Sequence, residues 1–328
     1  MRRREFVGFL GGLGLIWPHT AMAQQAVSPI RIGFLPLGSP SDSYDQSLVQ
    51  AFRKGLNNVG LSENREVTID VVWVSNEPEF PSAVSNLIQR GAKLLVTAGS
   101  SASAAAKRYP SAVPIVFVAV GNPIGIGLVE TLAWPGWNAT GFSDVLADLS
   151  SKYVDFAGQL GGGQAAVHYL WHTAWPDGQH RYKATEHAVQ SVGVDLRSRG
   201  ITYIDEVDDA FAALKSGGAK VIIIQPSPFT YRHRNRIISS AQGLGLGTIF
   251  GWPQTGREGA LMGYGPDYAH LYGEVGSYVV RILKGAKPAD LPVQEPTKFA
   301  LVINRRNAKA LGLAIPPALL ATADELIE

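Results

Sequence analysis

The chain has 328 residues, of which 46% are hydrophobic and 17% are charged. This length suggests two domains at roughly 100–200 residues each, and the apolar fraction excludes a wholly disordered chain. The absence of cysteine excludes disulfides, thiolate metal sites and a cysteine nucleophile, and a net charge of +2 gives no support for nucleic-acid binding.

The first 23 residues have the pattern of an export signal. Arg2–Arg4 precede a glycine-rich apolar stretch, and Ala21–Ala23 form a small-residue cleavage site before Gln24. The arginines and the weakly hydrophobic stretch also resemble a twin-arginine signal. The stretch of about 12 residues is shorter than the ~20 that a membrane-spanning helix needs. We therefore expect cleavage rather than anchoring, and a soluble periplasmic chain that begins at Gln24.

Residues 30–120 alternate between short apolar runs and segments with helical spacing. The apolar runs predict strands at 30–35, 67–74, 94–97 and 113–120. Apolar residues three and four apart predict helices at 46–59 and 80–90, and an alanine-rich segment predicts another at 100–108. This alternation predicts a parallel sheet with helices on both faces.

The same alternation restarts in the second half of the chain. It predicts strands at 165–171, 194–199, 221–225 and 247–250, and helices at 182–191, 208–215 and 234–244. No long linker separates the halves near residues 138–148. We therefore expect two closely packed α/β lobes with a cleft between them, where ligands bind beyond the carboxyl ends of the strands.

Polar residues gather where three strands of the first half end. Ser39 and Ser41 follow the first strand, Ser100 and Ser101 the third, and Asn122, itself followed by proline, the fourth. Serine and asparagine cap helices, and free N–H groups at a helix N-terminus favour an anion such as a small carboxylate. Taken singly, each position favours plain capping. Taken together, the three positions favour capping and ligand binding about equally as interpretations.

Three stretches carry a family resemblance that covers essentially the whole chain. They are Val113–Phe142, Gly259–Asp267 and the tail from Ile282 to Asn304, with further similarity over 308–328. They resemble the TrpX-like ABC-transporter substrate-binding proteins, which are periplasmic binding proteins of the type I fold. The resemblance implies two Rossmann-like lobes that close on a small solute and deliver it to an ABC permease in the inner membrane. We expect no cofactor, no metal, no nucleic acid, and a monomer.

The resemblance also predicts how the chain divides. Crossovers between lobes are expected near 140–143, 263–266 and 293–297, with the helix over 268–284 returned to lobe one. Lobe one should comprise 24–141 and 267–294, and lobe two 142–266 and 295–328.

The relatives handle amino-acid-like solutes, aromatic ones in the TrpX branch. The resemblance therefore implies that loops of lobe one hold the polar head of the ligand and that loops of lobe two complete the site. The expected ligand-binding residues are Ser39, Ser41, Ser100, Ser101, Asn122, Ser143, Thr173, Trp175, Ser227, Trp252 and Tyr264.

The chain departs from the family pattern at three places. The family usually has Gly-Asp-Pro at 121–123, Arg-Pro-Gly-Gly-Asn at 134–138 and an Asn-Pro-rich loop at 172–178. Asn122 removes a charge, so a solute less cationic than in relatives is expected if that aspartate pairs with an ammonium. Trp171 and Trp175 are added, and with Trp252 and Tyr264 they could form an aromatic wall, although ordinary packing explains any one tryptophan better.

Other patterns indicate no further chemistry. His168 and His172 would lie ~13 Å apart along a strand, too far for one metal ion. The basic run 232–236 is interpreted as a solvated helix start. There is no GxSxG, Walker or EF-hand motif. An exported α/β enzyme is thus the second hypothesis. A LacI-type sensory domain is the third, and it would need a helix-turn-helix in place of the export signal.

Overall fold

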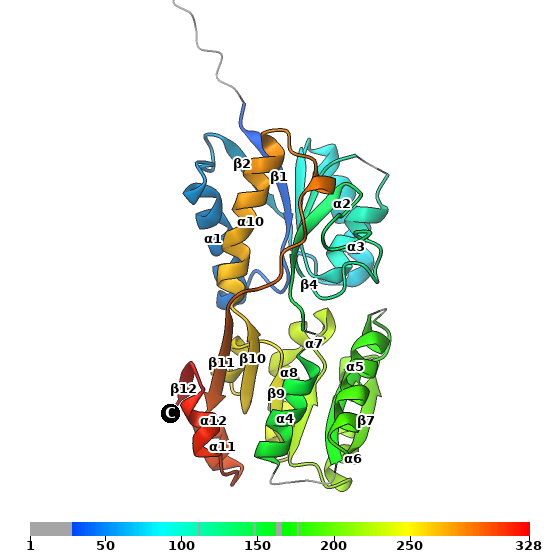
Figure 1. Cartoon of the computed structure of the whole chain (residues 1–328), viewed down its shortest axis with the longest axis vertical. Coiled ribbons are helices and arrows are strands. Elements are labelled where there is room, and N and C mark those ends of the chain that lie inside the picture. The colour runs from blue at the N-terminus through cyan, green and yellow to red at the C-terminus, as the bar shows by residue number, and fades with distance from the viewer. Residues whose placement is uncertain (1–27, 111, 147–148, 162–165, 176) are drawn as a thin grey trace, which may run out of the picture.

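The computed structural model describes residues 28–110, 112–146, 149–161, 166–175 and 177–328. The expected export signal at 1–23 lies outside the described residues. Two α/β lobes are stacked along the long axis of the molecule (Figure 1). No helix in the described part of the chain combines the length and hydrophobicity that crossing a bilayer requires.

The first lobe contains a five-stranded, fully parallel sheet in the order β2-β1-β3-β4-β5. Its strands are β1 Ile30–Leu35, β2 Val67–Val71, β3 Leu94–Ala98, β4 Ile115–Val120 and β5 Ala139–Ser143. One face is covered by α1 Ser43–Asn58 and α10 Tyr268–Leu283, and the other by α2 Phe80–Gln89 and α3 Ser100–Arg108.

Helix α10 joins this lobe from far along the sequence because it packs tightly on α1. Phe34 and Phe52 meet beneath the pair with ring centroids 4.9 Å apart. A Cβ at Gly55 would lie 2.0 Å from the carbonyl oxygen of Gly273, so the two helix backbones touch where only glycine fits. The helix over 268–283 therefore packs on α1.

The second lobe contains a seven-stranded sheet in the order β12-β11-β10-β9-β8-β6-β7. Its strands are β6 Ala166–His172, β7 Asp195–Ile201, β8 Val221–Ile224, β9 Gly247–Phe250, β10 Met262–Pro266, β11 Phe299–Asn304 and β12 Glu325–Ile327. Strand β11 runs antiparallel to β10, against the expectation of a fully parallel sheet. The reason is that the chain re-enters this lobe from the opposite direction after α10.

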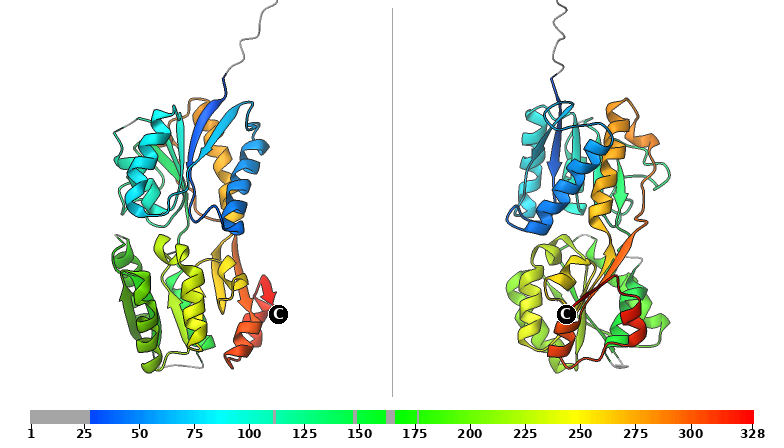
Figure 2. Two further views of the ribbon diagram at one scale, coloured as in Figure 1. Left: turned by 180° about the vertical axis from the view of Figure 1, so that it is seen from behind. Right: turned by 90° about the vertical axis from the view of Figure 1, so that its left-hand side faces the viewer.

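Helices cover both faces of this sheet, as the views from behind and from the side show (Figure 2). They are α4 Ser150–Leu160, α5 Gly178–Ser191, α6 Val207–Ser216, α7 Pro228–Arg232, α8 Arg234–Gly243, α9 Gln254–Arg257, α11 Arg305–Ala310 and α12 Pro317–Ala321. Short 3₁₀ turns lie at Glu77–Glu79, Ile204–Glu206 and Pro288–Asp290. The predicted class, two Rossmann-like lobes with helices on both faces, is confirmed.

The segment around residues 140–143, near which the first crossover is expected, is paired into the sheet of the first lobe. It forms the edge strand β5, and the chain leaves the first lobe only after Ser143. The returning chain pairs with this strand, because Gln294 donates its N–H to the Gly141 carbonyl at 2.9 Å and accepts from the Ser143 N–H at 2.8 Å. The strand was not predicted, nor was α4, which follows it.

The predicted helix start at Asn122 is wrong. Asn122 accepts a hydrogen bond from the Gly125 N–H at 2.8 Å, and the chain forms a turn rather than a helix. The positive φ of 69° at Gly127 ends helical geometry there. At α3 the cap is Gly99, with φ 80°, so Ser100 is the first helical residue and not the cap.

Candidate functional site

A small cavity lies between the lobes, at the carboxyl ends of strands from both sheets. It has a volume of about 20 Å³. Its walls are formed by Leu37, Gly99, Ser100 and Ala119 of lobe one, Asp144 and Leu146 of the first crossing segment, and Trp175, Arg181, Pro226, Ser227, Pro228 and Trp252 of lobe two. Both lobes and the segment that joins them therefore contribute to one site.

A larger groove lies next to the cavity. The groove has a volume of about 530 Å³ and shares Ser100 and Trp175 with the cavity. A space of 20 Å³ holds about one water molecule. A larger solute therefore needs the lobes to separate.

Arg181 on α5 is the most buried cation of this site, with 3% of its surface exposed. Its Nε donates to Asp177 Oδ2 at 3.2 Å, and its Nη2 forms an ion pair with Asp144 Oδ1 at 3.5 Å. Its guanidinium carbon lies 5.1 Å from the centre of the Trp175 ring. Its Nη1 is buried and has no hydrogen-bond partner within the described residues.

The charges of this cluster shift one another's pKa values. Burial lowers the pKa of Arg181, but the Asp144 and Asp177 carboxylates more than offset it, so that pKa is raised. Burial also raises the pKa of Asp144, against the opposing charge of Arg181. The guanidinium therefore stays protonated at any physiological pH.

Lobe one leaves room for this guanidinium. A Cβ at Gly121 would lie 1.7 Å from Arg181 Nη2, so the side chain reaches across the interface only because that position is glycine. The neighbouring Asn122 donates from Nδ2 to Asp177 Oδ1 at 3.0 Å. These contacts hold α5 against the end of β4.

The backbone is strained on two sides of the cavity. Ala119 has φ 57° and lies at the register shift between β4 and β5, and Val145 has φ 47°. Left-handed geometry at a non-glycine residue costs ~1–3 kcal/mol and clusters at functional sites. Here it positions Ala119 in the cavity wall and Asp144 beside Arg181.

Four of the predicted ligand residues meet in the cavity: Ser100, Trp175, Ser227 and Trp252. Ser101 and Asn122 lie in the outer groove instead. The Ser101 hydroxyl donates to Glu77 Oε1 at 2.8 Å, pointing away from the cavity.

The structure places the remaining five elsewhere. Ser39 and Ser41 share a hydrogen bond of 2.9 Å at the rim of the cleft, and the Ser143 hydroxyl accepts from the Val145 N–H within the crossing segment. Thr173 contacts the Thr202 hydroxyl at 2.7 Å on the exposed side of lobe two. Tyr264 packs on Phe156, with centroids 5.3 Å apart, inside lobe two.

The aromatic wall is therefore smaller than expected. Trp175 and Trp252 line the cavity, whereas Trp171 packs on Tyr182 with ring centroids 5.0 Å apart. Tyr231 extends the wall behind Trp252, with centroids 4.9 Å apart.

Sequence reasoning missed Asp144 and Arg181. Asp144 directly follows β5, so the rule that ligands bind beyond strand ends would have indicated it once that strand was recognised. Arg181 lay just before the predicted helix at 182–191, and no pattern in the sequence marks it. In the described part of the chain, no group of His, Asp or Glu is placed to hold a metal ion.

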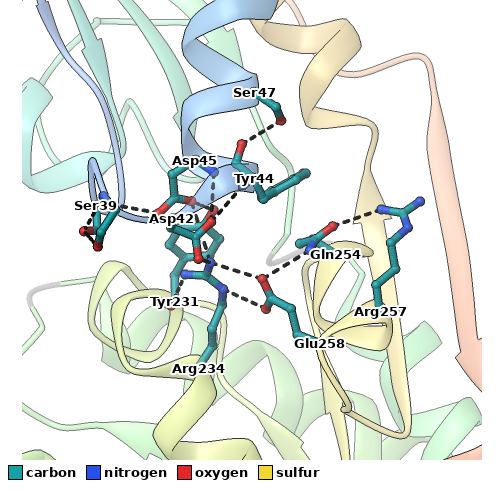
Figure 3. A network of polar contacts seen from close by, with 11 residues as sticks. Ser39, Asp42, Tyr44, Asp45, Ser47, Tyr231, Arg234, Gln254, Arg257 and Glu258 are labelled. Atoms are coloured by element: carbon teal, nitrogen blue, oxygen red, sulfur yellow. Dashed lines mark hydrogen bonds and ion pairs between the residues drawn. The ribbon is translucent and has the colours of Figure 1, made fainter.

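A second polar network joins the lobes at the rim of the cleft (Figure 3). Arg234 of α8 donates from Nη2 to Asp42 Oδ2 at 2.6 Å, from Nε to Glu258 Oε2 at 2.8 Å and from Nη1 to the Tyr231 carbonyl at 3.2 Å. Its side chain is 4% exposed. The interpretation of residues 232–236 as a solvated helix start is therefore wrong for Arg234, because carboxylates of the opposite lobe bury it.

Asp45 is the least exposed carboxylate of this rim network. It accepts a hydrogen bond from the Tyr231 hydroxyl at 2.5 Å and another from the Ser39 N–H at 2.8 Å. Burial raises the pKa of Asp45 to about 6, against the Tyr231 hydrogen bond and the Arg234 charge, which lower it. Asp45 is thus a carboxylate at the interface that titrates near neutral pH.

Comparison with known proteins agrees with this architecture. Residues 41–327 match the family described as ABC transporter substrate binding protein. A tyrosine-binding protein from Clostridioides difficile is 24% identical over 80% of this chain and 76% of its own length.

Two solved structures share the fold over nearly the whole chain. A conserved domain protein from Vibrio cholerae has a TM-score of 0.84 at 22% identity and covers 90% of this chain and 99% of its own. An ABC domain from Streptococcus pneumonia in complex with L-Trp has a TM-score of 0.83 at 22% identity, over 92% of this chain and 100% of its own. The chain belongs to the ABC-transporter substrate-binding protein family.

Proposed function

We propose that this protein is the periplasmic solute-binding component of an ABC importer and that it binds a small amino-acid-like solute with an aromatic body. The observation that carries the proposal is the cavity between the lobes, with walls from both lobes and from the segment that connects them. A ligand that contacts both lobes stabilises their closed arrangement, because only that arrangement offers all the contacts at once.

The chemistry of the cavity wall fits such a solute. Trp175 and Trp252 offer apolar ring surface, while Ser100, Ser227 and the Arg181–Asp144 pair offer polar groups for a head group. Ligand sites typically combine apolar walls with a few convergent polar groups. The relatives bind tyrosine or tryptophan according to their names, and the proposal extends that class to this chain.

The connections between the lobes suit opening and closing. The chain passes between the sheets three times, after Ser143, at Asp267 and between Gln294 and Phe299. Short connections let two rigid lobes rotate about a few backbone torsions. The rim network of Arg234 would form on closure and break on opening.

Ligand identification tests the proposal directly. The mature protein would be titrated by calorimetry with the twenty amino acids, and ligand recovered from purified protein would be identified by mass spectrometry. We expect saturable binding of an aromatic amino acid, returned chemically unchanged. A recovered product of altered composition would favour an exported enzyme, and the absence of binding to any amino acid would contradict the proposed solute class.

Location and assembly have separate tests. N-terminal sequencing of exported protein should read Gln-Gln-Ala-Val, the residues that follow Ala23. Light scattering should give the mass of a monomer. An intact Met1 in a membrane fraction would contradict export with cleavage.

A further inference from the structure

We infer that Arg181 binds the carboxylate of the ligand and that Asp144 binds its ammonium group, so that the cavity selects zwitterionic α-amino acids over the corresponding acids and amines. This inference rests on the proposed function and deepens it. It assigns the head group to residues of lobe two and of the crossing segment, rather than to the serines of lobe one alone.

The first argument is the unpaired nitrogen of Arg181. A guanidinium has five N–H donors. Asp177 takes Nε and Asp144 pairs with Nη2, but Nη1 is buried and has no partner within the described residues. An unpaired buried donor is costly, and more so on a charged group. Because Arg181 lines the cavity, a ligand oxygen is the natural partner for Nη1.

The second argument is that the guanidinium is held in place before any ligand arrives. Asp177 and Asp144 pair with it on two sides, the Trp175 ring lies 5.1 Å from its carbon, and Gly121 leaves the space it occupies. A pre-positioned donor loses little conformational freedom on binding. The Gly99 N–H donates to the Val118 carbonyl at 2.9 Å, so the N-terminus of α3 offers the second carboxylate oxygen its first helical N–H groups, beginning at Ser100, which lines the same cavity.

The third argument is the charge of the cluster. Arg181 with Asp144 and Asp177 carries one net negative charge when all three are ionised. A ligand with a carboxylate alone would add a second buried negative charge, which is costly. An ammonium group on the same ligand cancels it. The bonds of Asp144 to Arg181 and to the Leu146 N–H both use Oδ1, so within the described residues Oδ2 remains for that ammonium.

Matched probes separate the two charges. The series is L-tyrosine, tyramine without the carboxylate, and 3-(4-hydroxyphenyl)propionate without the ammonium, with the L-tryptophan, tryptamine and indole-3-propionate series in parallel. Calorimetry on the wild-type protein should show the amino acid binding about 10- to 150-fold more tightly than either analogue, the range for one charge-assisted hydrogen bond.

Two variants then assign the carboxylate to Arg181. Arg181→Gln should lower amino-acid affinity to that of the amine and leave amine affinity unchanged or improved. Because that change leaves Asp144 and Asp177 buried without their cation, Arg181→Gln with Asp177→Asn is the second variant, and it keeps the net charge of the cluster. Arg236→Gln, at an exposed arginine paired with Asp208, is the matched control and should change none of the affinities.

The outcomes distinguish the inference from the proposed function. If both variants lose affinity equally for the amino acid and for the amine, Arg181 has only a structural role and the inference is overturned. Wild-type protein that binds tyramine as tightly as L-tyrosine would also overturn it, while solute binding itself would stand. Wild-type protein that binds no amino acid would overturn the proposed solute class and, with it, the inference.

Discussion

Two buried arginines cross from the second lobe to the first, and they differ in one respect. Arg181 at the cavity and Arg234 at the rim are 3% exposed each, and both are paired with two or more carboxylates. Arg234 has a hydrogen-bond acceptor for each of its nitrogens, whereas Nη1 of Arg181 has none within the described residues. All three nitrogens of the rim arginine are hydrogen-bonded within the protein. The cavity arginine, as inferred above, has all its nitrogens hydrogen-bonded only when a ligand is bound.

This difference indicates how the same residue type serves two purposes. A fully paired buried network contributes to holding one arrangement of the lobes, and removing a member leaves uncompensated charge. A partly paired network, held rigid by its neighbours, is a binding site. We therefore expect changes at the rim to act mainly on stability, and changes at the cavity to act mainly on ligand affinity.

The largest effect should come from Arg234→Gln. It leaves Asp42, Asp45 and Glu258 at the interface without their cation, so the free energy of unfolding should fall by about 3–5 kcal/mol. Denaturant unfolding measures this change. The control Arg236→Gln should stay within about 0.5 kcal/mol of wild type, as exposed substitutions do. A loss below 1 kcal/mol for Arg234→Gln would remove the distinction between the two arginines.

The second largest expected effect is the pH dependence of folding stability that Asp45 causes at the rim. The folded pKa of Asp45 is about 6, against ~3.9 in an unfolded chain. Between these values the folded state binds the extra proton, so the wild-type protein loses stability as pH rises from 4 to 6. The difference between these two pKa values corresponds to about 3 kcal/mol. Asp45→Asn removes this titration.

The measurement is the difference in melting temperature between Asp45→Asn and wild type. The melting temperature of Asp45→Asn should rise relative to that of wild type as pH rises from 4 to 7. The control variant is Asp70→Asn. Asp70 pairs with Arg31 at 2.7 Å in lobe one, away from the interface. A difference for Asp45→Asn that is constant across this range would show that the carboxylate does not titrate there.

A substitution at Gly121 tests the role of the cavity arginine, Arg181. Gly121→Ala places a Cβ 1.7 Å from Arg181 Nη2 and forces the guanidinium to move. Overpacking of this kind costs ~1–3 kcal/mol, which corresponds to about 5- to 150-fold in affinity if it acts on the bound state. Calorimetry with L-tyrosine or L-tryptophan measures the loss. Gly158→Ala, in open space on α4, is the matched control and should leave affinity unchanged.

The smallest effects separate the two neighbouring serines. Ser100 lines the cavity, so Ser100→Ala should weaken binding about 3- to 10-fold, the range for one neutral hydrogen bond. Ser101→Ala should change affinity less than twofold, because its hydroxyl donates to Glu77 in the outer groove. The reverse order would place the ligand head group in the groove rather than in the cavity.

Much of the fold follows from local patterns in the sequence. Apolar runs of four to eight residues between helical segments predicted β1, β3, β4, β8 and β9 within two residues of their ends. Strand β5 was missed because Ala139–Ser143 contains a glycine and two polar residues and lacks a continuous apolar run. Its burial comes from pairing with β4 and with the returning chain at Gln294, which lies 151 residues beyond Ser143.

The sequence by itself determined the lobes, the family and the strand ends where Ser100, Trp175, Ser227 and Trp252 lie, because these follow from periodicity and motif. Only the tertiary structure decided which polar residues face the cavity. Asp177 and Arg181 lie four residues apart at the start of α5, but Asp144 follows β5 in the crossing segment, and Arg234 looked like part of a solvated basic run. Their roles depend on which side chains of the opposite lobe exclude water from them. Burial of a charge is a property of the surroundings rather than of the residue, so no local pattern records it.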